Sequence, residues 1–370
     1  MRLVPGRSGW WCIAPSGTAL LPAGWVTGGA LARHARAALE LTGITEPKPV
    51  TAYALTVLTS TRCNLGCPYC FQNTGTAAPG RFDPPRIAAA TLRPRTVRSI
   101  ATFTRDRMAA AGLSKLHVLL FGGEPLANPR GCTELLARLG EIAELSAFSA
   151  AMVSNGTLLD APLAAQLEVL GLRSVQITLD GPQWIHDTLR VTRSGRGTFD
   201  RILDNVAVAQ QATDLRVDLR INLTPAVLPY LAELIGQVAG RLCATRCRLG
   251  IAPVGEVPPE AAEQVVAAYA VARAAGFRIP RPTDGRCAYC AEPDGRTGAV
   301  VNADGILYSC WESAGRPGFE VGDVESGYRA YPAGRWVRCT RASQRFVDAV
   351  DAGLLDLLWE ERRDRQWARS

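Results

Sequence analysis

Three cysteines with short spacing are the residues of this sequence best suited to chemistry. Cys63, Cys67 and Cys70 form a C-x3-C-x2-C pattern in the segment TRCNLGCPYCF. One loop with this spacing can place three thiolates around one face of a cubic iron–sulfur cluster, and Gly66 and Pro68 favour the tight turns that it needs. A four-iron cluster normally takes four thiolates, so three local ligands leave one iron open to a reactant. A structural zinc site and ordinary core cysteines are the alternatives, but zinc requires a fourth ligand nearby and usually shows paired C-x2-C knuckles.

The same loop resembles the signature of a known family. A C-x3-C-x2-C loop after the first strand of an α/β domain is similar to that of the radical S-adenosylmethionine superfamily. In that family the open iron chelates the amino and carboxylate groups of S-adenosylmethionine, and an electron from the cluster breaks the C5′–S bond. The resemblance implies a [4Fe–4S] cluster on the three cysteines, with Tyr69 beside the cofactor. The products would be methionine and a 5′-deoxyadenosyl radical that abstracts hydrogen from the substrate, so the cofactors supply the difficult chemistry.

Two segments after the next predicted strands extend the resemblance. Gly122, Gly123 and Glu124 belong to a GGEP segment, similar to the one whose backbone and glutamate meet the amino group of S-adenosylmethionine. Glycines let a backbone approach a ligand closely, and a carboxylate suits an ammonium group. A strand-ending turn is the alternative. Ser154 and Asn155 begin an SNGT segment, similar to the family's segment near the ribose, with a simple Asn-Gly turn as the alternative.

Three further segments, QITLDGP, HDTLR and GRGTF, resemble the peptide- and protein-modifying branch of the family. This branch includes anaerobic sulfatase maturases and maturases of ribosomally made peptides. The resemblance implies that Arg190 pairs with the carboxylate of S-adenosylmethionine, with a surface or helix-cap salt bridge as the alternative. Asp180 is a candidate catalytic residue, or a turn former before Gly181. The resemblance covers about residues 52–225.

A second group of cysteines follows near the C-terminus. Cys287, Cys290 and Cys310 show a C-x2-C-x14-G-x4-C arrangement, which resembles the opening of the SPASM and Twitch extensions that carry auxiliary clusters. A hairpin turn at Asp304-Gly305 would bring Cys310 back towards Cys290. A complete SPASM tail has more cysteines, whereas here Cys339 alone follows. The resemblance implies one auxiliary [4Fe–4S] cluster on these four cysteines, with zinc or free thiols as alternatives. The remaining cysteines are expected to act as small hydrophobic side chains: Cys12, Cys132, Cys243 and Cys247. The last two form C-x3-C, which could supply a ligand to the tail.

Alternating strands and helices must position these residues. Short apolar strands separated by helix-length segments predict βαβ units with a parallel sheet. Six such strands, without a seventh and eighth, indicate an α/β fold: a partial (β/α)6 TIM-like barrel whose site lies at the carboxyl ends of the strands. The predicted strands cover residues 54–58, 116–121, 150–154, 174–179, 216–222 and 248–253. The predicted helices cover residues 94–111, 133–145, 161–170, 199–211 and 226–241.

The chain divides into three predicted segments. Residues 1–50 form a small hairpin and helix, in which Trp10–Ile13 pairs with Thr18–Leu21. Residues 51–257 form the radical SAM partial barrel. Residues 258–370 form the cysteine-rich extension, which begins with a helix and ends with a charged helix over residues 345–369.

Composition limits the other function classes. Eleven cysteines without a secretion signal indicate metal ligands or redox groups in a reducing compartment. Three histidines leave little material for mixed zinc sites or a Ser–His–Asp triad. The net charge of +7 comes from scattered arginines without a basic stripe, which favours a compositional origin over a nucleic-acid partner. With no apolar run of about 18 residues, the sequence predicts a cytoplasmic protein with neither a membrane nor a nucleic-acid partner.

These observations predict a radical S-adenosylmethionine enzyme that modifies a side chain of a ribosomally made peptide or protein. Crosslinking, epimerisation and oxidation are the expected outcomes. An electron donor of the flavodoxin or ferredoxin type is implied, and the substrate would dock on the N-terminal hairpin or on a separate leader-binding protein. One alternative is a small-molecule substrate, such as an aminoglycoside or a cofactor precursor. Another is a non-catalytic binding protein stabilised by zinc or a cluster.

Overall fold

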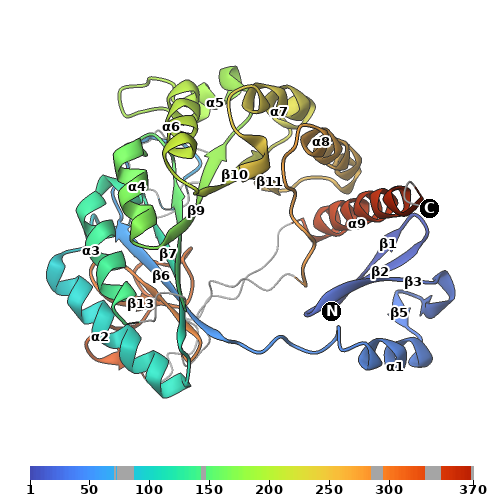
Figure 1. The fold of residues 1–370 in the computed structure, drawn as a ribbon, viewed down its shortest axis with the longest axis horizontal. Helices are drawn as coiled ribbons and strands as arrows, with labels where there is room; N and C mark the ends of the chain where they lie inside the picture. Colours follow the sequence, from blue (N-terminus) through green and yellow to red (C-terminus); the bar gives the residue numbers. More distant parts are fainter. Residues whose placement is uncertain (71, 73–86, 143–146, 285–294, 330–342, 368–370) are drawn as a thin grey trace.

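One open sheet of ten strands carries the candidate site residues (Figure 1). The computed structural model describes residues 1–70, 72, 87–142, 147–284, 295–329 and 343–367. The strand order is β11-β10-β9-β8-β7-β6-β12-β13-β14-β15, with parallel pairing from β11 through to β12 and antiparallel pairing beyond. Because β11 and β15 lie at opposite ends of this order, the barrel is open, and the predicted partial barrel is confirmed. The strands are β6 (Ala52–Ser60), β7 (Lys115–Gly122), β8 (Phe148–Ser154), β9 (Leu172–Leu179), β10 (Arg216–Leu223), β11 (Cys247–Pro253), β12 (Gly298–Val301), β13 (Ile306–Tyr308), β14 (Glu320–Asp323) and β15 (Gly327–Tyr328).

Helices cover the outer face of the parallel part of the sheet (Figure 1). Alternate residues of each strand point towards them, so Val118, Met152 and Ile177 are buried in one continuous core. The α-helices of the barrel are α2 (Pro94–Ala111), α3 (Pro129–Gly140), α4 (Ala161–Val169), α5 (Gln183–Leu189), α6 (Phe199–Ala212), α7 (Leu231–Ala239) and α8 (Ala262–Ala274). Short 3-10 turns are η2 (Pro125–Ala127), η4 (Leu228–Tyr230), η5 (Ala244–Arg246) and η6 (Pro259–Ala261).

Two predicted helices have different bounds in the structure. The helix predicted over residues 133–145 is α3, which begins at Pro129 because the side chain of Asn128 accepts a hydrogen bond from the backbone N–H of Gly131 at 3.2 Å. The helix predicted over residues 226–241 is divided into η4 and α7. The short helix α5 was not predicted, although it carries the approach to Arg190.

The inner face of the sheet is apolar around β6, β7, β12 and β13. Leu58, Leu119 and Phe121 from β6 and β7 form a buried cluster with Val300 and Tyr308 from β12 and β13. The tail therefore fills this side of the open barrel with its own side chains.

The C-terminal tail joins the barrel sheet. The predicted hairpin at Asp304-Gly305 is confirmed by the antiparallel pairing of β12 with β13, and Gly305 has a φ of 90°. The sequence did not indicate that β12 pairs in parallel with β6, where a Cβ on Gly298 would lie 2.4 Å from the carbonyl oxygen of Ala54. Cys310 is fully buried two residues after β13. Its expected partner ligands, Cys287, Cys290 and Cys339, lie outside the described residues.

The two ends of the chain pack together. The predicted hairpin of Trp10–Ile13 with Thr18–Leu21 is confirmed, and a further strand makes it a three-stranded sheet. The C-terminal helix packs on this sheet through Trp11 and Leu355 and on α8 at its other side. The elements are β1 (Arg2–Gly6), β2 (Gly9–Ala14), β3 (Gly17–Leu21), η1 (Ala23–Trp25), β4 (Val26–Thr27), β5 (Ala30–Leu31), α1 (Arg33–Leu41) and α9 (Gln344–Trp367).

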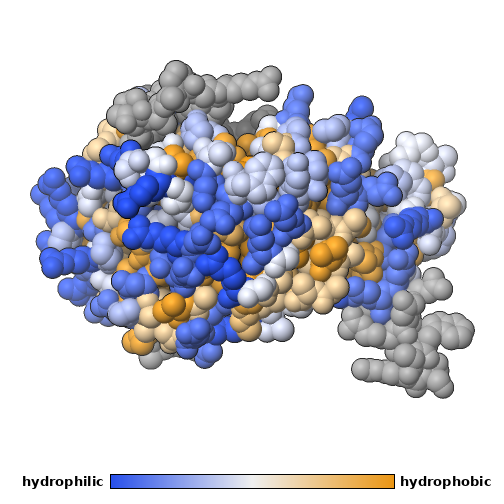
Figure 2. Space-filling view, turned by 90° about the horizontal axis from the view of Figure 1, so that it is seen from above, coloured by the Kyte–Doolittle hydropathy of each residue, from blue (hydrophilic) through white to orange (hydrophobic). Residues whose placement is uncertain are grey.

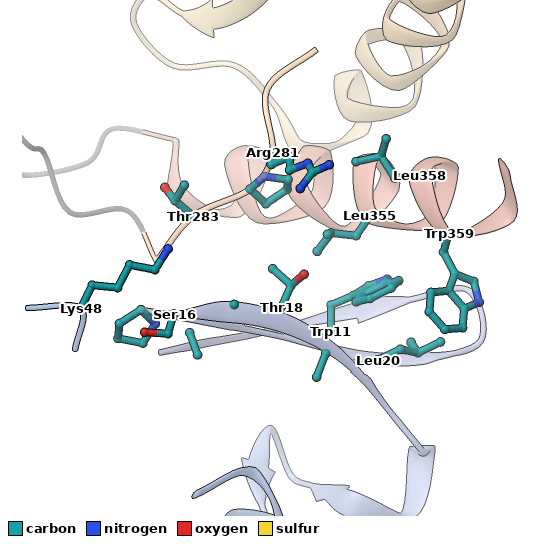
Figure 3. Close-up of a pocket in the computed structure, with 15 residues that line it drawn as sticks. Trp11, Ser16, Thr18, Leu20, Lys48, Arg281, Thr283, Leu355, Leu358 and Trp359 are labelled. Carbon is teal, nitrogen blue, oxygen red and sulfur yellow. The ribbon is translucent and has the colours of Figure 1, made fainter. Parts of the chain in front are cut away.

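A cavity of about 450 Å³ lies between β3 and α9 (Figure 3). Thr18 and Leu20 of β3 line one side, and Leu355 and Trp359 of α9 line the other.

One face of the molecule is seen in the space-filling view (Figure 2). Hydrophilic residues cover most of the face in Figure 2, and apolar residues gather there in a few patches. No described helix is both long and apolar enough to cross a membrane.

Asp356 on α9 is expected to hold the two chain ends together. Its side chain, which is 7% exposed, accepts hydrogen bonds from Trp11 Nε1 at 2.8 Å and from the backbone N–H of Arg7 at 3.0 Å. Asp356→Ala leaves both donors without a partner and should lower the free energy of unfolding by about 2 kcal/mol, measured by urea titration. Glu360 on the same helix pairs with Arg7 in solvent, so Glu360→Ala should cost no more than about 0.5 kcal/mol. Equal effects of the two substitutions would contradict this role.

Candidate functional site

The cysteine loop lies directly after β6, at the carboxyl end of the parallel strands. Cys63, Cys67 and Cys70 are each partly exposed there. The middle of the loop is held to the segment after α5: the backbone N–H of Gly66 donates to the carbonyl oxygen of Val191 at 2.9 Å. The loop is therefore fixed from a second element before any ligand binds.

Gly122 and Gly123 allow the end of β7 to dock on the start of this loop. The backbone N–H of Gly123 donates to the carbonyl oxygen of Ser60, and that of Glu124 to Arg62, each at 2.9 Å. A Cβ on Gly122 would lie 2.1 Å from the carbonyl oxygen of Ser60, and one on Gly123 would lie 2.6 Å from that of Arg62. The structure shows that the glycines make room for the backbone of the cysteine loop itself.

Glu124 joins the ends of β7 and β8. The residue is fully buried, and its carboxylate accepts hydrogen bonds from the backbone N–H groups of Leu126 and Asn155 at 2.9 and 2.7 Å and from the hydroxyl of Ser154 at 2.9 Å. Burial raises the pKa of Glu124, whereas these donors act in the opposite direction. In this structure the carboxylate positions the chain, and no part of it is exposed to a ligand's ammonium group.

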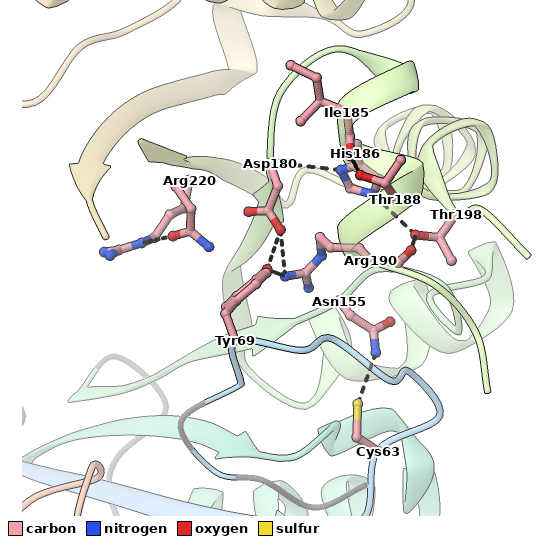
Figure 4. Close-up of polar contacts among 11 residues, drawn as sticks. Cys63, Tyr69, Asn155, Asp180, Ile185, His186, Thr188, Arg190, Thr198 and Arg220 are labelled. Carbon is pink, nitrogen blue, oxygen red and sulfur yellow. Dashed lines mark hydrogen bonds and ion pairs between the residues drawn. The ribbon is translucent and has the colours of Figure 1, made fainter. Parts of the chain in front are cut away.

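Asn155 connects the end of β8 to the cysteine loop (Figure 4). Its side-chain amide donates to Asn64 Oδ1 at 2.9 Å and contacts Cys63 Sγ at 3.8 Å. The hydroxyl of Thr157 accepts a hydrogen bond from Asn64 Nδ2 at 2.8 Å. The Asn-Gly turn also exists, because Gly156 has a φ of 78°. The SNGT segment thus forms a turn and contacts the loop at the same time.

Tyr69, Asp180 and Arg190 form a polar cluster at the other end of the loop, in which Asp180 and Arg190 are buried and Tyr69 is partly buried (Figure 4). The Tyr69 hydroxyl donates to Asp180 Oδ2 and accepts from an Arg190 guanidinium nitrogen at 2.7 Å, and Arg190 lies 3.7 Å from Asp180. Burial acts to lower the pKa of Arg190, but the nearby charges of Tyr69, Cys67 and Asp180 outweigh it and raise that pKa. Two atoms of the cluster are buried without a partner in the described chain, Asp180 Oδ1 and Arg190 Nε.

His186 supports this cluster from behind. The backbone N–H of Asp180 donates to His186 Nδ1 at 3.3 Å, and His186 Nε2 lies 3.1 Å from Thr198 Oγ1. Because Thr198 donates its hydroxyl proton to the carbonyl oxygen of Arg190 at 2.6 Å, it accepts from Nε2–H of His186. This directional chain fixes the neutral ring. Burial, and secondarily Arg190, lower the pKa of His186 to about 3.

The three thiols are neighbours with shared electrostatics. Burial raises the pKa of Cys63 to about 12, and negative charge on Glu124, Cys67 or Cys70 would raise it further. Burial also raises the pKa of Cys67, against the effect of Arg190. No group of three His, Cys, Asp or Glu side chains in the described residues is placed to hold one metal ion. In a [4Fe–4S] cube each thiolate binds a different iron, so three cysteines of one loop need not converge on a single ion to hold a cluster.

The other cysteines lie away from this loop. Cys12 and Cys132 are fully buried in apolar surroundings, and Cys132 bonds to the carbonyl oxygen of Pro125. Cys247 is buried at the start of β11, the end of the strand opposite to the cysteine loop, and Cys243 is exposed beside it.

Sequence reasoning missed three residues that organise the site: Asn64, Thr157 and Thr198. Asn64 and Thr157 lie within the quoted motifs, so a signal existed. Thr198 lies in the quoted GRGTF segment, but its contacts with Arg190 and His186 could not be read from the motif.

Because β7 docks closely on the cysteine loop, we expect a single added methyl group to lower both the stability and the iron content of the protein. Gly123→Ala places a Cβ against two backbone carbonyl groups, so it should displace the loop, lower the free energy of unfolding by about 1–3 kcal/mol and reduce the iron retained after anaerobic reconstitution. Gly236→Ala in α7 meets open space and should retain wild-type iron and stability or better. Wild-type iron content in Gly123→Ala would contradict the proposed support of the loop.

The buried histidine predicts a pH dependence of stability. The unfolded chain takes up a proton near the ordinary pKa of 6.5, whereas the folded protein does so only near pH 3. The contribution of His186 to the free energy of unfolding is therefore fully present above about pH 6.5. It falls by about 1.4 kcal/mol per pH unit as the pH is lowered towards about 3. His186→Asn should remove that slope in urea titrations of the apoprotein over this range. His117, which is exposed, provides the control: His117→Asn should keep the slope. An unchanged slope in His186→Asn would refute the assignment.

Comparison with known proteins agrees with this geometry. Residues 57–221 match the family model of the Radical SAM superfamily. The chain is 36% identical over 126 residues to a GTP 3′,8-cyclase of Moorella thermoacetica, a match that covers 34% of each chain. It is 31% identical over 152 residues to the GTP 3′,8-cyclase of Geobacter sulfurreducens, covering 41% of this chain and 40% of that protein. The chain thus spans well under half the length of these curated relatives.

Solved structures share the fold over a longer stretch. Native anSMEcpe with bound AdoMet is similar with a TM-score of 0.57 at 15% identity, covering 81% of this chain and 84% of that chain. Streptococcus suis SuiB bound to the precursor peptide SuiA has a TM-score of 0.52 at 15% identity, covering 87% of this chain and 74% of that one. At this identity the likeness establishes the fold. Together with the family match, it shows that the chain contains a radical SAM domain and that residues 57–221 belong to the Radical SAM superfamily.

Proposed function

We propose that this chain is a radical SAM enzyme that holds a [4Fe–4S] cluster on Cys63, Cys67 and Cys70 and binds S-adenosylmethionine beside it. The observation that carries the proposal is that four segments meet at one cysteine loop. The ends of β7 and β8, Asp180 after β9 and the segment after α5 all bond to residues 60–69. When bound, the cluster supplies an electron for reductive cleavage of the cofactor, in keeping with the superfamily.

The chain's own residues would bind and shield the cofactor. Asp180 Oδ1 and Arg190 Nε are buried, unpartnered and complementary to the ammonium and carboxylate of an amino acid. Gly122, Gly123 and Glu124 support the loop, and Asn155 lies against the sulfur of Cys63. A donor near a ligand sulfur stabilises its charge when metal is bound.

A peptide or protein side chain is the proposed substrate. The segments around Asp180 and Arg190 resemble peptide-modifying members of the family, and the similar structures include anSMEcpe with a bound peptide and SuiB bound to its precursor peptide. The N-terminal sheet offers a docking element, because β3 pairs with β2 on one side and lines the cavity against α9 on the other (Figure 3). An edge strand can pair with an extended peptide.

A small-molecule substrate is the second candidate. It is favoured by the sequence matches, which are to GTP 3′,8-cyclases. In either case the proposal includes an external one-electron donor of the flavodoxin or ferredoxin type. It also includes an auxiliary cluster on Cys310 with Cys287, Cys290 and Cys339. Where the N-terminal sheet alone does not bind the substrate peptide, a separate leader-binding protein is proposed. The proposed location is the cytoplasm.

Anaerobic turnover tests the function. With S-adenosylmethionine and dithionite, the reconstituted wild-type protein should release 5′-deoxyadenosine, whereas Cys67→Ala should release none and Cys132→Ala should retain the activity. Mass spectrometry of a candidate peptide from a neighbouring gene should show a mass change that requires Cys67. Cys310→Ala should keep cofactor cleavage and lose the peptide product. Turnover of GTP with no change in the peptide would favour the second candidate, and absence of 5′-deoxyadenosine would refute the proposed activity.

A further inference from the structure

Arg220 is a charged side chain that faces the inside of the open barrel. Its neighbours along β10, Leu219 and Ile221, are buried in the outer core, so Arg220 points to the opposite face. In the sheet it pairs with Thr178 on β9 and with Gly250 on β11. In Figure 4 the side chain of Arg220 extends away from Asp180 and Tyr69.

The guanidinium has no carboxylate partner among the described residues. Its Nε donates to Asn222 Oδ1 at 3.2 Å, and none of the ion pairs within the described chain involves it. By contrast, Arg248 on the adjacent strand pairs with Asp218 at 2.8 Å, and Arg190 pairs with Asp180.

Burial removes water from the charged guanidinium of Arg220, which is unfavourable. Desolvation lowers the pKa of Arg220, although the charges of Asp180 and Glu312 act in the opposite direction. Arginine remains protonated at physiological pH. A half-buried cation without a counterion destabilises the fold unless a ligand supplies the missing negative charge.

We propose that Arg220 binds a single carboxylate of the substrate and so orients the substrate beside the Cys63–Cys70 loop. The inference deepens the proposed function and rests on it. A planar guanidinium binds a carboxylate through two parallel hydrogen bonds. One cation without an ion pair among the described residues suits one carboxylate, whereas a triphosphate requires several cations. An acidic residue or the C-terminal carboxylate of a peptide has the required chemistry.

Stability of the ligand-free protein gives the first test. Arg220→Met removes a charge that has no ion-pair partner among the described residues, so it should raise the melting temperature of the apoprotein. Arg248→Met breaks an existing ion pair and should leave the melting temperature unchanged or lower it. A fall in Arg220→Met larger than in Arg248→Met would mean that Arg220 has a structural partner, and would overturn the proposal.

Ligand binding gives the second test, on the anaerobically reconstituted protein. Glutarate, compared with chloride at equal ionic strength, should raise the melting temperature of the wild type and of Arg248→Met. Arg220→Met should lower the affinity for glutarate about tenfold or more, and Arg220→Lys should lie between. The affinity for S-adenosylmethionine, measured by isothermal titration calorimetry, should be the same in wild type and Arg220→Met. Loss of that affinity would assign Arg220 to the cofactor's carboxylate and overturn a substrate role.

The remaining outcomes are also decisive. Stabilisation by inorganic pyrophosphate that greatly exceeds that by glutarate would identify a phosphate site and overturn the carboxylate assignment. No response to either anion would overturn the proposal altogether. If glutarate binds through Arg220 but the wild type releases no 5′-deoxyadenosine, the carboxylate site stands while the proposed activity fails.

Discussion

The contact between the end of β7 and the start of the cysteine loop is the constraint on which the site depends. Two backbone hydrogen bonds, from Gly123 to Ser60 and from Glu124 to Arg62, hold these two segments close together. At this separation neither Gly122 nor Gly123 can carry a side chain. The buried carboxylate of Glu124 then ties the same point to β8. Because backbone groups make these bonds, the loop is positioned before any cofactor arrives, and binding does not have to order it.

The charged side chains described in the site have hydrogen-bond donors or an opposite charge as partners, with the exception of Arg220. Glu124 is surrounded by hydrogen-bond donors, and Asp180 and Arg190 neutralise each other through Tyr69. His186 is held neutral by hydrogen bonds on both ring nitrogens. Arg220, one strand away, has an amide oxygen as its partner and no carboxylate within the described chain. Because the neighbouring charged side chains are paired with one another, Arg220 is the candidate for binding a substrate group of opposite charge.

The sequence predicted those features that are local in the chain. Buried parallel strands are short apolar runs, so all six strands of the barrel were located, and the turn at Asp304-Gly305 was recognised from its two residues. Partners distant in the sequence were beyond reach. The pairing of β12 with β6 and the packing of α9 on the N-terminal sheet depend on surfaces that no local pattern specifies. The contact of Gly123 with the backbone of Arg62 was not predicted for the same reason.

The central claim is that three cysteines hold a cluster whose fourth iron is open to S-adenosylmethionine. Electron paramagnetic resonance of the dithionite-reduced protein, recorded with and without S-adenosylmethionine, tests it most directly. We predict a [4Fe–4S] signal whose g-values shift when the cofactor is added and which is missing from the variant with alanine at Cys63, Cys67 and Cys70. The absence of any cluster signal that responds to the cofactor, or a protein that holds zinc at this loop, would contradict the account.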